Sequence, residues 1–272
     1  MFMPSVGRAT RGASALLWII LMASPADAAE VLLHAAGSLR DALTDVAKAF
    51  ETSSGERVRQ KYGASGTLRD TIASGERAEV FASANMAHPH SLAQAGRAGP
   101  AVLFARNRLC ALVKPGLAVT ADNLLERMLS VDIKLGTSTP KADPSGDYAF
   151  EVFGKAEAIK AGSRAALEQK ALQLTGGATS AQPPDGRSVY GWHIAQGRAD
   201  IFLAYCTGAT AAATENPGQQ IVPLPEALAV AADYGLTVMN EASPAAYRFA
   251  MFILSTEGQG ILTKHGFAAP GL

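Results

Sequence analysis

Three short segments place a serine among small residues, at points where a strand-like run or a loop gives way to a helical pattern. They are Ala36-Gly37-Ser38, Ala64-Ser65-Gly66-Thr67 and Pro144-Ser145-Gly146. A helix N-terminus presents unpaired N–H groups and the positive end of the helix dipole, so it binds an anion without a charged side chain. Small residues let the anion approach the backbone, and a serine hydroxyl adds one more donor. One such turn is typical of an ordinary serine cap, but three in one chain indicate an anion site.

Tyr205 supplies a fourth candidate donor through its hydroxyl. It ends the apolar run of residues 201–204, which is typical of a strand buried on both faces. Ligands of open α/β sheets lie at the carboxyl ends of the strands, where the three serine segments are also expected. The alternative interpretation is that the tyrosine ring only covers the end of its strand.

Strand-like and helical patterns alternate along the chain and must position these donors. Residues 31–35 predict a strand, and the apolar spacing from Leu39 to Phe50 predicts a helix that Ser38 caps and Gly55 ends. Further strands are predicted at residues 58–62, 78–82, 109–113, 132–136, 201–205, 221–223 and 236–240, and further helices around residues 68–72, 89–95, 148–174, 188–196, 245–254 and 259–265. This alternation predicts an α/β protein with largely parallel sheets.

Residues 1–28 predict a cleaved secretory signal peptide. Arg8 and Arg11 precede an apolar run at residues 13–23, and Ala26-Asp27-Ala28 matches a small-x-small cleavage site. The apolar run is much shorter than the roughly 20 residues that a membrane-spanning helix needs. The mature chain is therefore expected outside the cytoplasm.

Charge and motifs argue against several other classes of protein. The chain has 24 Lys and Arg against 24 Asp and Glu, which does not favour a nucleic-acid-binding surface or an electrostatic membrane footprint. The sequence has no G-x-S-x-G motif, and none of its five histidines has an acidic partner at a recognisable spacing. The pair His88-Pro89-His90 is more typical of a solvated turn than of a metal site.

Cys110 and Cys206 both lie in the mature chain and would meet an oxidising compartment. Each lies in or beside a strand-like run. The pattern is compatible with a disulfide and equally with two buried thiols, because sequence does not show whether the two side chains meet.

Several stretches resemble the signature segments of the periplasmic molybdate-binding proteins of ABC importers. They are residues 31–43, 62–72, 75–84 and 201–209, and residues 254–267 resemble the closing helices of that family. The resemblance implies an α/β type II periplasmic binding protein fold with two lobes. Each lobe would be a mixed, mainly parallel sheet flanked by helices, and crossing hinge strands would join the two.

The same resemblance implies where the lobes divide and which residues bind the ligand. Lobe I would comprise residues 29–107 and 208–272, and lobe II residues 108–207. The ligand-binding positions of the family fall on two serine hydroxyls, a main-chain donor and a tyrosine, which are Ser38, Ser65, Ser145 and Tyr205.

Arg187 departs from the family pattern. Eighteen residues before Tyr205 the family has a small or apolar residue that contributes a backbone N–H, and here that spacing falls on Arg187. Either the guanidinium contacts the anion, or it pairs with Asp185 and leaves a backbone N–H to bind. A guanidinium contact would admit other anions.

The implied function is binding without catalysis. The protein would capture a tetrahedral oxyanion, molybdate or tungstate, in the periplasm and deliver it to an inner-membrane ABC permease and its ATPase. It is expected to be a monomer with no cofactor and no bare metal ion. Two alternatives stay open: a binding protein for another oxyanion or a small organic anion, which Arg187 favours, and a secreted serine-type hydrolase.

Overall fold

A computed structural model describes residues 1–3 and 30–270, so the predicted signal peptide lies outside the described residues apart from its first three. The strands are β1 (Glu30–Ala36), β2 (Arg57–Gly63), β3 (Val80–Ser83), β4 (Val102–Val113), β5 (Leu135–Ser138), β6 (Leu172–Thr175), β7 (Ile201–Tyr205), β8 (Gln220–Pro223) and β9 (Ala231–Val238). The helices are α1 (Arg40–Ser54), α2 (Ser65–Ala73), α3 (Ala87–Gln94), α4 (Leu124–Leu129), α5 (Pro144–Ile159), α6 (Ser163–Lys170), α7 (Val189–Ala195), α8 (Cys206–Glu215), α9 (Pro244–Leu254) and α10 (Thr256–Lys264), with short 3-10 helices η1 (Gly37–Leu39) and η2 (Glu226–Leu228). No helix in these ranges is long and apolar enough to cross a membrane.

One curled sheet of nine strands runs through the molecule in the order β2-β1-β3-β9-β4-β7-β5-β6, with β8 paired to β4. The strands β2, β1 and β3 are parallel, and so are β7, β5 and β6. Every antiparallel pair in this sheet involves β4 or β9. The sheet therefore consists of two parallel parts joined by a pair of antiparallel strands, as the sequence predicts for an α/β protein.

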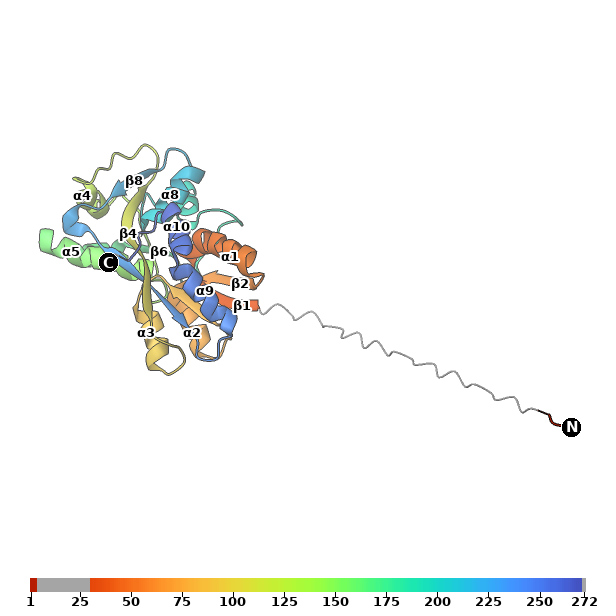
Figure 1. Cartoon of the computed structure of the whole chain (residues 1–272). Coiled ribbons are helices and arrows are strands. Elements are labelled where there is room, and N and C mark those ends of the chain that lie inside the picture. Colours follow the sequence, from red (N-terminus) through yellow and green to blue (C-terminus); the bar gives the residue numbers. More distant parts are fainter. Residues whose placement is uncertain (4–29, 271–272) are drawn as a thin grey trace.

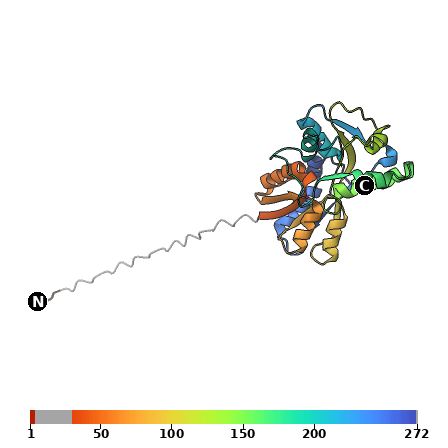
Figure 2. The same cartoon turned by 180° about the vertical axis from the view of Figure 1, so that it is seen from behind.

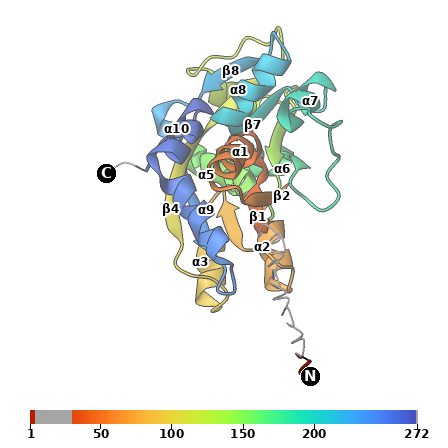
Figure 3. The ribbon, with the colours of Figure 1, turned by 45° about the vertical axis from the view of Figure 1, so that its right-hand side comes forward.

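Strand β4 crosses from one part of the sheet to the other. Its residues 102–108 pair with β9, whereas residues 109–113 pair with β7. We call β1, β2, β3, β9 and the helices packed on them lobe I, and β5 to β8 with their helices lobe II. Figures 1 and 3 show α2 and α3 of lobe I at one end of the molecule and α8 and β8 of lobe II at the other. Figure 2 shows the same arrangement from behind, with α5 (green) at the level where the lobes meet.

The chain returns to lobe I later than the predicted boundary at residue 208. Helix α8 packs on α7 and β4, and β8 pairs with residues 110–113 of β4. Residues 208–223 therefore lie with lobe II, and the second crossing runs from β8 to β9. The predicted boundary ended lobe II at residue 207, because the sequence shows no obvious signal for α8.

Several predicted elements differ in type or extent from the structure. The helical segment predicted over residues 148–174, with a break at Gly162, forms the two helices α5 and α6 on either side of that glycine, and Leu172–Thr175 instead forms β6, parallel to β5. Strand β9 begins at Ala231 rather than at residue 236, because pairing with β4 draws weak strand formers such as Ala231 and Asp233 into the sheet.

Aromatic and aliphatic side chains fill the space between the sheet and the helices of lobe I. Phe50 of α1 packs against Phe249 of α9, with ring centroids 5.1 Å apart. Gly55, which adopts a left-handed conformation with φ of 76°, ends α1 as predicted. Helix α1 thereby holds the β1 to η1 turn, and with it Ser38, in a fixed position.

Cys110 of β4 and Cys206 at the start of α8 form a disulfide that links positions 96 residues apart. The sequence left this pairing open. The bond ties the residue directly after Tyr205 to the strand that joins the two lobes.

We expect Cys110→Ser combined with Cys206→Ser to lower the free energy of unfolding by about 2–4 kcal/mol, because the reduced chain gains a long unconstrained loop when unfolded. Thermal denaturation followed by circular dichroism measures the change. The wild-type protein in a reductant should melt as the double variant does, and the double variant should not respond to the reductant. Equal melting temperatures for wild type and variant would contradict the prediction.

Candidate functional site

Each of the three serines lies just after the end of a strand, and two buried tyrosines belong to the same group of hydroxyls. Ser38 lies in η1 after β1, Ser65 begins α2 after β2, and Ser145 lies in the first turn of α5 after β5. Tyr205 ends β7, and Tyr234 of β9 packs on it with ring centroids 5.5 Å apart. We call these five residues the hydroxyl cluster.

Ser38 is not the helix cap that its sequence predicts. The N-cap of α1 is Leu39, and Ser38 makes no capping hydrogen bond. Its Oγ lies instead 3.0 Å from the hydroxyl oxygen of Tyr234. An additional turn of 3-10 helix separates β1 from α1, so the Ser38 side chain points away from the N–H groups that a cap would accept from.

Asn107 of β4 contacts the same tyrosine and leaves it able to donate in this contact. Its Oδ1 accepts from the backbone N–H of Arg108 at 2.9 Å, which leaves Nδ2 to donate to Thr207 Oγ1 at 2.8 Å and to the Tyr234 hydroxyl oxygen at 3.4 Å. An amide N–H only donates, so Tyr234 accepts here and can donate its own proton to Ser38. Ser38 then keeps its proton free for a ligand.

Ser65 is oriented in the same way by a different donor. Its side chain is 1% exposed, and its Oγ accepts from the backbone N–H of Ala84 at 3.1 Å. That N–H satisfies the oxygen as an acceptor, so the hydroxyl proton is free to be donated. Ser65 therefore presents a donor held in place from behind.

The two lobes touch directly beside Ser65. The backbone N–H of Gly66 donates to the carbonyl oxygen of Ala142 at 2.9 Å, and a Cβ at Gly66 would lie 2.2 Å from the carbonyl oxygen of Lys141. Tyr148 adds a second contact between lobes by donating to the carbonyl oxygen of Ala84 at 3.4 Å. Only glycine allows this approach of α2 to the segment before α5.

The hydroxyls of Tyr205 and Ser145 are buried and have no hydrogen-bond partner within the described residues. Burial raises the pKa of the Tyr205 hydroxyl well above its usual range, so this group stays protonated and donates. Buried donors without partners cost free energy unless a ligand accepts from them.

The main-chain N–H of Ser145 does not have the role that the resemblance implies. Asp143 is the N-cap of α5, and its Oδ1 accepts this N–H at 3.0 Å. Helix α5 begins at Pro144, four residues before the predicted range of 148–174, which brings Ser145 inside the first turn. The free donor at this position is the Ser145 hydroxyl.

A carboxylate, Asp143, also lies beside the hydroxyl cluster. Among the residues described, it is the one carboxylate whose charge raises the pKa of both Tyr190 and Tyr205. Burial raises its pKa to about 6, although the N–H of Ser145 and the hydroxyl of Ser138 act in the opposite direction. The carboxyl group therefore titrates close to neutral pH. Sequence reasoning missed it because an Asp-Pro pair at a helix start is an ordinary cap.

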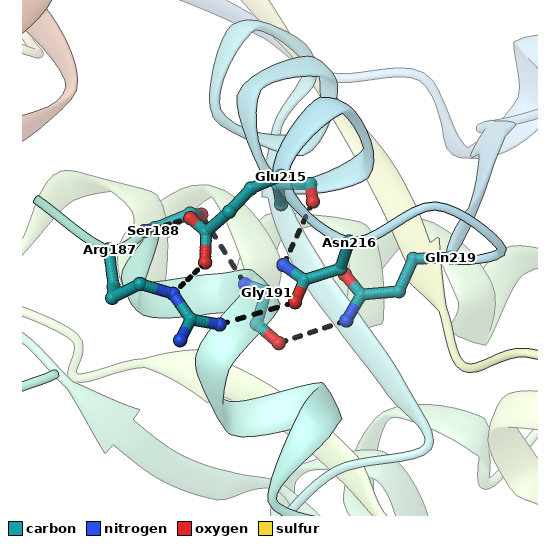
Figure 4. A network of polar contacts seen from close by, with 7 residues as sticks. Arg187, Ser188, Gly191, Glu215, Asn216 and Gln219 are labelled. Atoms are coloured by element: carbon teal, nitrogen blue, oxygen red, sulfur yellow. Dashed lines mark hydrogen bonds and ion pairs between the residues drawn. The ribbon is translucent and has the colours of Figure 1, made fainter.

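Arg187 is held by residues at the C-terminal end of α8 (Figure 4). Its guanidinium pairs with Glu215 and donates through Nη2 to Asn216 Oδ1 at 3.3 Å, while Glu215 also accepts from the backbone N–H of Ser188 at 2.6 Å. The prediction that Arg187 pairs with Asp185 was therefore wrong, because its partner is Glu215. Glu215 ends the helix that begins just after Tyr205, which is about 14 Å of helix away at 1.5 Å per residue.

The expected alternative for Arg187 was a free backbone N–H, and this is also not observed. That N–H donates to the carbonyl oxygen of Pro184 at 3.1 Å. Neither group of Arg187 is therefore available to an anion in this arrangement.

We expect Arg187→Ala to change anion affinity by less than about threefold. An exposed ion pair contributes roughly 0–1 kcal/mol, so stability should fall only slightly. Isothermal titration of the variant and of Glu215→Gln, which breaks the same pair from the other side, measures both effects. A loss of more than thirtyfold confined to Arg187→Ala would place the guanidinium at the anion.

The structure does not support a serine-type hydrolase. His34 pairs with Glu76 and His265 with Asp45, and within the described part of the chain no serine of the hydroxyl cluster hydrogen-bonds a histidine. His88 is buried in α3, and burial lowers its pKa to about 4. Residues 1–3 and 30–270 contain no group of three or more His, Cys, Asp or Glu placed to hold a metal ion.

Comparison with known proteins gives consistent matches over almost the whole described chain. Residues 31–268 match the family model described as bacterial extracellular solute-binding protein. An uncharacterized protein of Pasteurella multocida is 38% identical over 174 residues, which are 64% of this chain and 72% of that protein. The molybdate-binding protein ModA of Mycobacterium bovis is 27% identical over 256 residues, which are 89% of this chain and 86% of ModA.

A solved structure shows the same fold. The periplasmic molybdate-binding protein of Azotobacter vinelandii superposes with a TM-score of 0.71 at 18% sequence identity, over 89% of this chain and 100% of that chain. This likeness confirms the predicted type II periplasmic binding protein fold.

Proposed function

Because the chain belongs to the bacterial extracellular solute-binding proteins, we propose that its hydroxyl cluster binds a tetrahedral oxyanion, with molybdate or tungstate as the first candidates. The family consists of binding proteins, so the prediction that the chain is not an enzyme is confirmed. The protein would act in the periplasm as a monomer and deliver the anion to an ABC permease and its ATPase. The wider inference of an ABC transporter partner follows from the family.

The observation that carries the proposal is a pair of buried hydroxyls, those of Tyr205 and Ser145, that have no hydrogen-bond partner in the part of the chain that the structure describes. Ser38 and Ser65 support it, because each oxygen is contacted from behind by a group that leaves its proton free. Four neutral donors from both lobes suit an anion that carries several acceptor oxygens and no proton. The resemblance to molybdate-binding proteins favours molybdate or tungstate among such anions.

The binding cycle follows from the position of these donors. The anion would first meet the donors of one lobe, and those of the other lobe would then replace the remaining water around it. Closure would bring Gly66 against Ala142, as in the contact described above. Hydrogen bonds from both lobes to the anion would stabilise the closed form, which a permease could recognise.

Isothermal titration of the protein purified from the periplasm of an expressing bacterium tests the proposal. We expect one molybdate or tungstate ion to bind per chain, and sulfate and phosphate to bind much more weakly. Sulfate binding of equal strength would contradict molybdate as the ligand, and the absence of binding by all four anions would contradict an oxyanion site.

A further inference from the structure

Asp143 places a carboxyl group among the donors of the hydroxyl cluster. Its Oδ1 accepts a hydrogen bond from the backbone N–H of Ser145. Its Oδ2 lies close to Gly176, where an added Cβ would be only 2.8 Å from this oxygen. The backbone N–H of Asp143 donates to the carbonyl oxygen of Thr139 at 2.9 Å, so the loop before α5 holds the residue in place. Oδ2 is packed against a glycine that adds no donor side chain.

Among the residues that the structure describes, no cation contributes to the pKa shift of this carboxyl group. The charged or titratable groups that face it are Asp147 of α5, Tyr190 of α7 and Tyr205 of β7, and Asp147 is itself acidic. The other groups that act on it are the N–H of Ser145 and the hydroxyl of Ser138. Arg187 is paired with Glu215 at the far end of α8.

A dianion beside an ionised carboxylate is disfavoured, because both are negative and Oδ2 has only acceptor lone pairs. One proton between the carboxyl group and an anion oxygen removes the repulsion and adds a hydrogen bond. The anion can bring this proton, as hydrogen phosphate does, or Asp143 can take it from solvent, as it must beside molybdate or sulfate.

We propose that Asp143 is a specificity-determining residue of the hydroxyl cluster and that the site binds an oxyanion together with one proton shared between the anion and the Asp143 carboxyl group. This inference rests on the proposed oxyanion function and deepens it. It makes the preference between unprotonated and protonated oxyanions depend on pH.

The direction of the pH dependence follows from proton linkage. The pKa of free Asp143 is raised to about 6, so above that pH the binding of an unprotonated dianion requires proton uptake. One proton taken up makes the affinity fall about tenfold for each unit of rising pH. Below about pH 6 the carboxyl group already carries its proton, and the affinity should level off. Hydrogen phosphate brings its own proton, so its affinity should fall much less between pH 7 and 8.5.

The test compares the wild-type protein with Asp143→Asn by isothermal titration with molybdate and with phosphate from pH 5.5 to 8.5. Asparagine keeps an oxygen that caps Ser145, so the fold should persist. Asp147→Asn is the matched control, because it removes a neighbouring carboxylate in the first turn of α5 that accepts from the backbone N–H of Lys141 at 2.8 Å. Repeating one titration in buffers of different ionisation enthalpy counts the protons taken up.

We expect wild type and Asp147→Asn to lose about tenfold in molybdate affinity per pH unit above pH 6.5, with uptake of close to one proton. Asp143→Asn should show a flat profile and bind molybdate at least thirtyfold more tightly than wild type at pH 8.5, with weaker phosphate binding. Identical pH profiles for Asp143→Asn and wild type would overturn the inference alone. Failure of the wild-type protein and all variants to bind any oxyanion would instead overturn the proposed function on which it rests.

Discussion

Replacement of both Ser38 and Ser65 by alanine is expected to lower oxyanion affinity by at least about a hundredfold. A hydrogen bond to a charged group contributes roughly 1.5–3 kcal/mol, so the loss of two donors corresponds to about 3–6 kcal/mol. The N–H of Ala84 donates to Ser65 Oγ and leaves its hydroxyl proton for the ligand, and the Tyr234 hydroxyl, 3.0 Å from Ser38 Oγ, is able to do the same for Ser38. Isothermal titration of the double variant measures the loss.

The stability of this variant distinguishes a binding role from a structural one. Alanine at Ser65 leaves the buried N–H of Ala84 without its acceptor, which costs about 1–3 kcal/mol of stability. The variant should nevertheless stay folded, because Ser38 does not cap α1. The control is Ser53→Ala with Ser54→Ala, whose hydroxyls donate only to Phe50 at the end of α1. Unchanged affinity in a folded double variant at Ser38 and Ser65 would contradict the assignment.

Gly66→Ala is expected to lower oxyanion affinity by more than about a hundredfold while α2 stays intact. Its Cβ would lie 2.2 Å from the carbonyl oxygen of Lys141 and 2.8 Å from that of Ala142, and backbone atoms cannot turn aside as a flexible side chain can. Lobe I would therefore be held away from lobe II. Within α2 itself, alanine is favoured over glycine by about 1 kcal/mol.

Gly154→Ala is the matched control for this substitution. Gly154 also lies within a helix, and its added Cβ would meet nothing within 4 Å. Titration gives the affinity of both variants, and small-angle scattering with ligand shows whether the lobes close. Wild-type affinity and a compact ligand-bound form in Gly66→Ala would show that the contact between Gly66 and Ala142 is not part of ligand binding.

Local patterns were sufficient to predict the positions of Ser38, Ser65 and Tyr205 at strand ends. Each lies within a few residues of an apolar strand and a helical repeat, so periodicity alone places the residue at the carboxyl end of a strand. The structure confirms those strands and helices. The roles of the three side chains in binding stay a prediction.

Contacts between distant parts of the chain were not predictable in this way. Tyr234 contacts Ser38 although the two are 196 residues apart in the sequence. It lies in the part of β9 whose small and polar residues do not show a strand pattern. Asn107 precedes the strand predicted from residue 109, although β4 already contains it. In both cases pairing within the sheet determines the structure and local propensity does not.

Arg187 shows how spacing misleads when the partner lies on an unpredicted element. Counting back from Tyr205 places it at a ligand position, whereas Glu215 on α8 holds its guanidinium elsewhere. Ser145 illustrates the same limit at shorter range, because Asp143 takes the N–H that the resemblance assigned to the anion. A sequence motif identifies a donor, but its neighbours decide which of its groups is free.

The position of the bound anion tests the central claim most directly. A crystal of the protein soaked with tungstate would reveal the metal atom by its anomalous scattering. We predict a single strong peak among Ser38, Ser65, Ser145 and Tyr205, with oxyanion oxygens within hydrogen-bond distance of the Tyr205 and Ser145 hydroxyls that lack partners here. A strong peak elsewhere on the protein, with none among these four residues, would contradict the account.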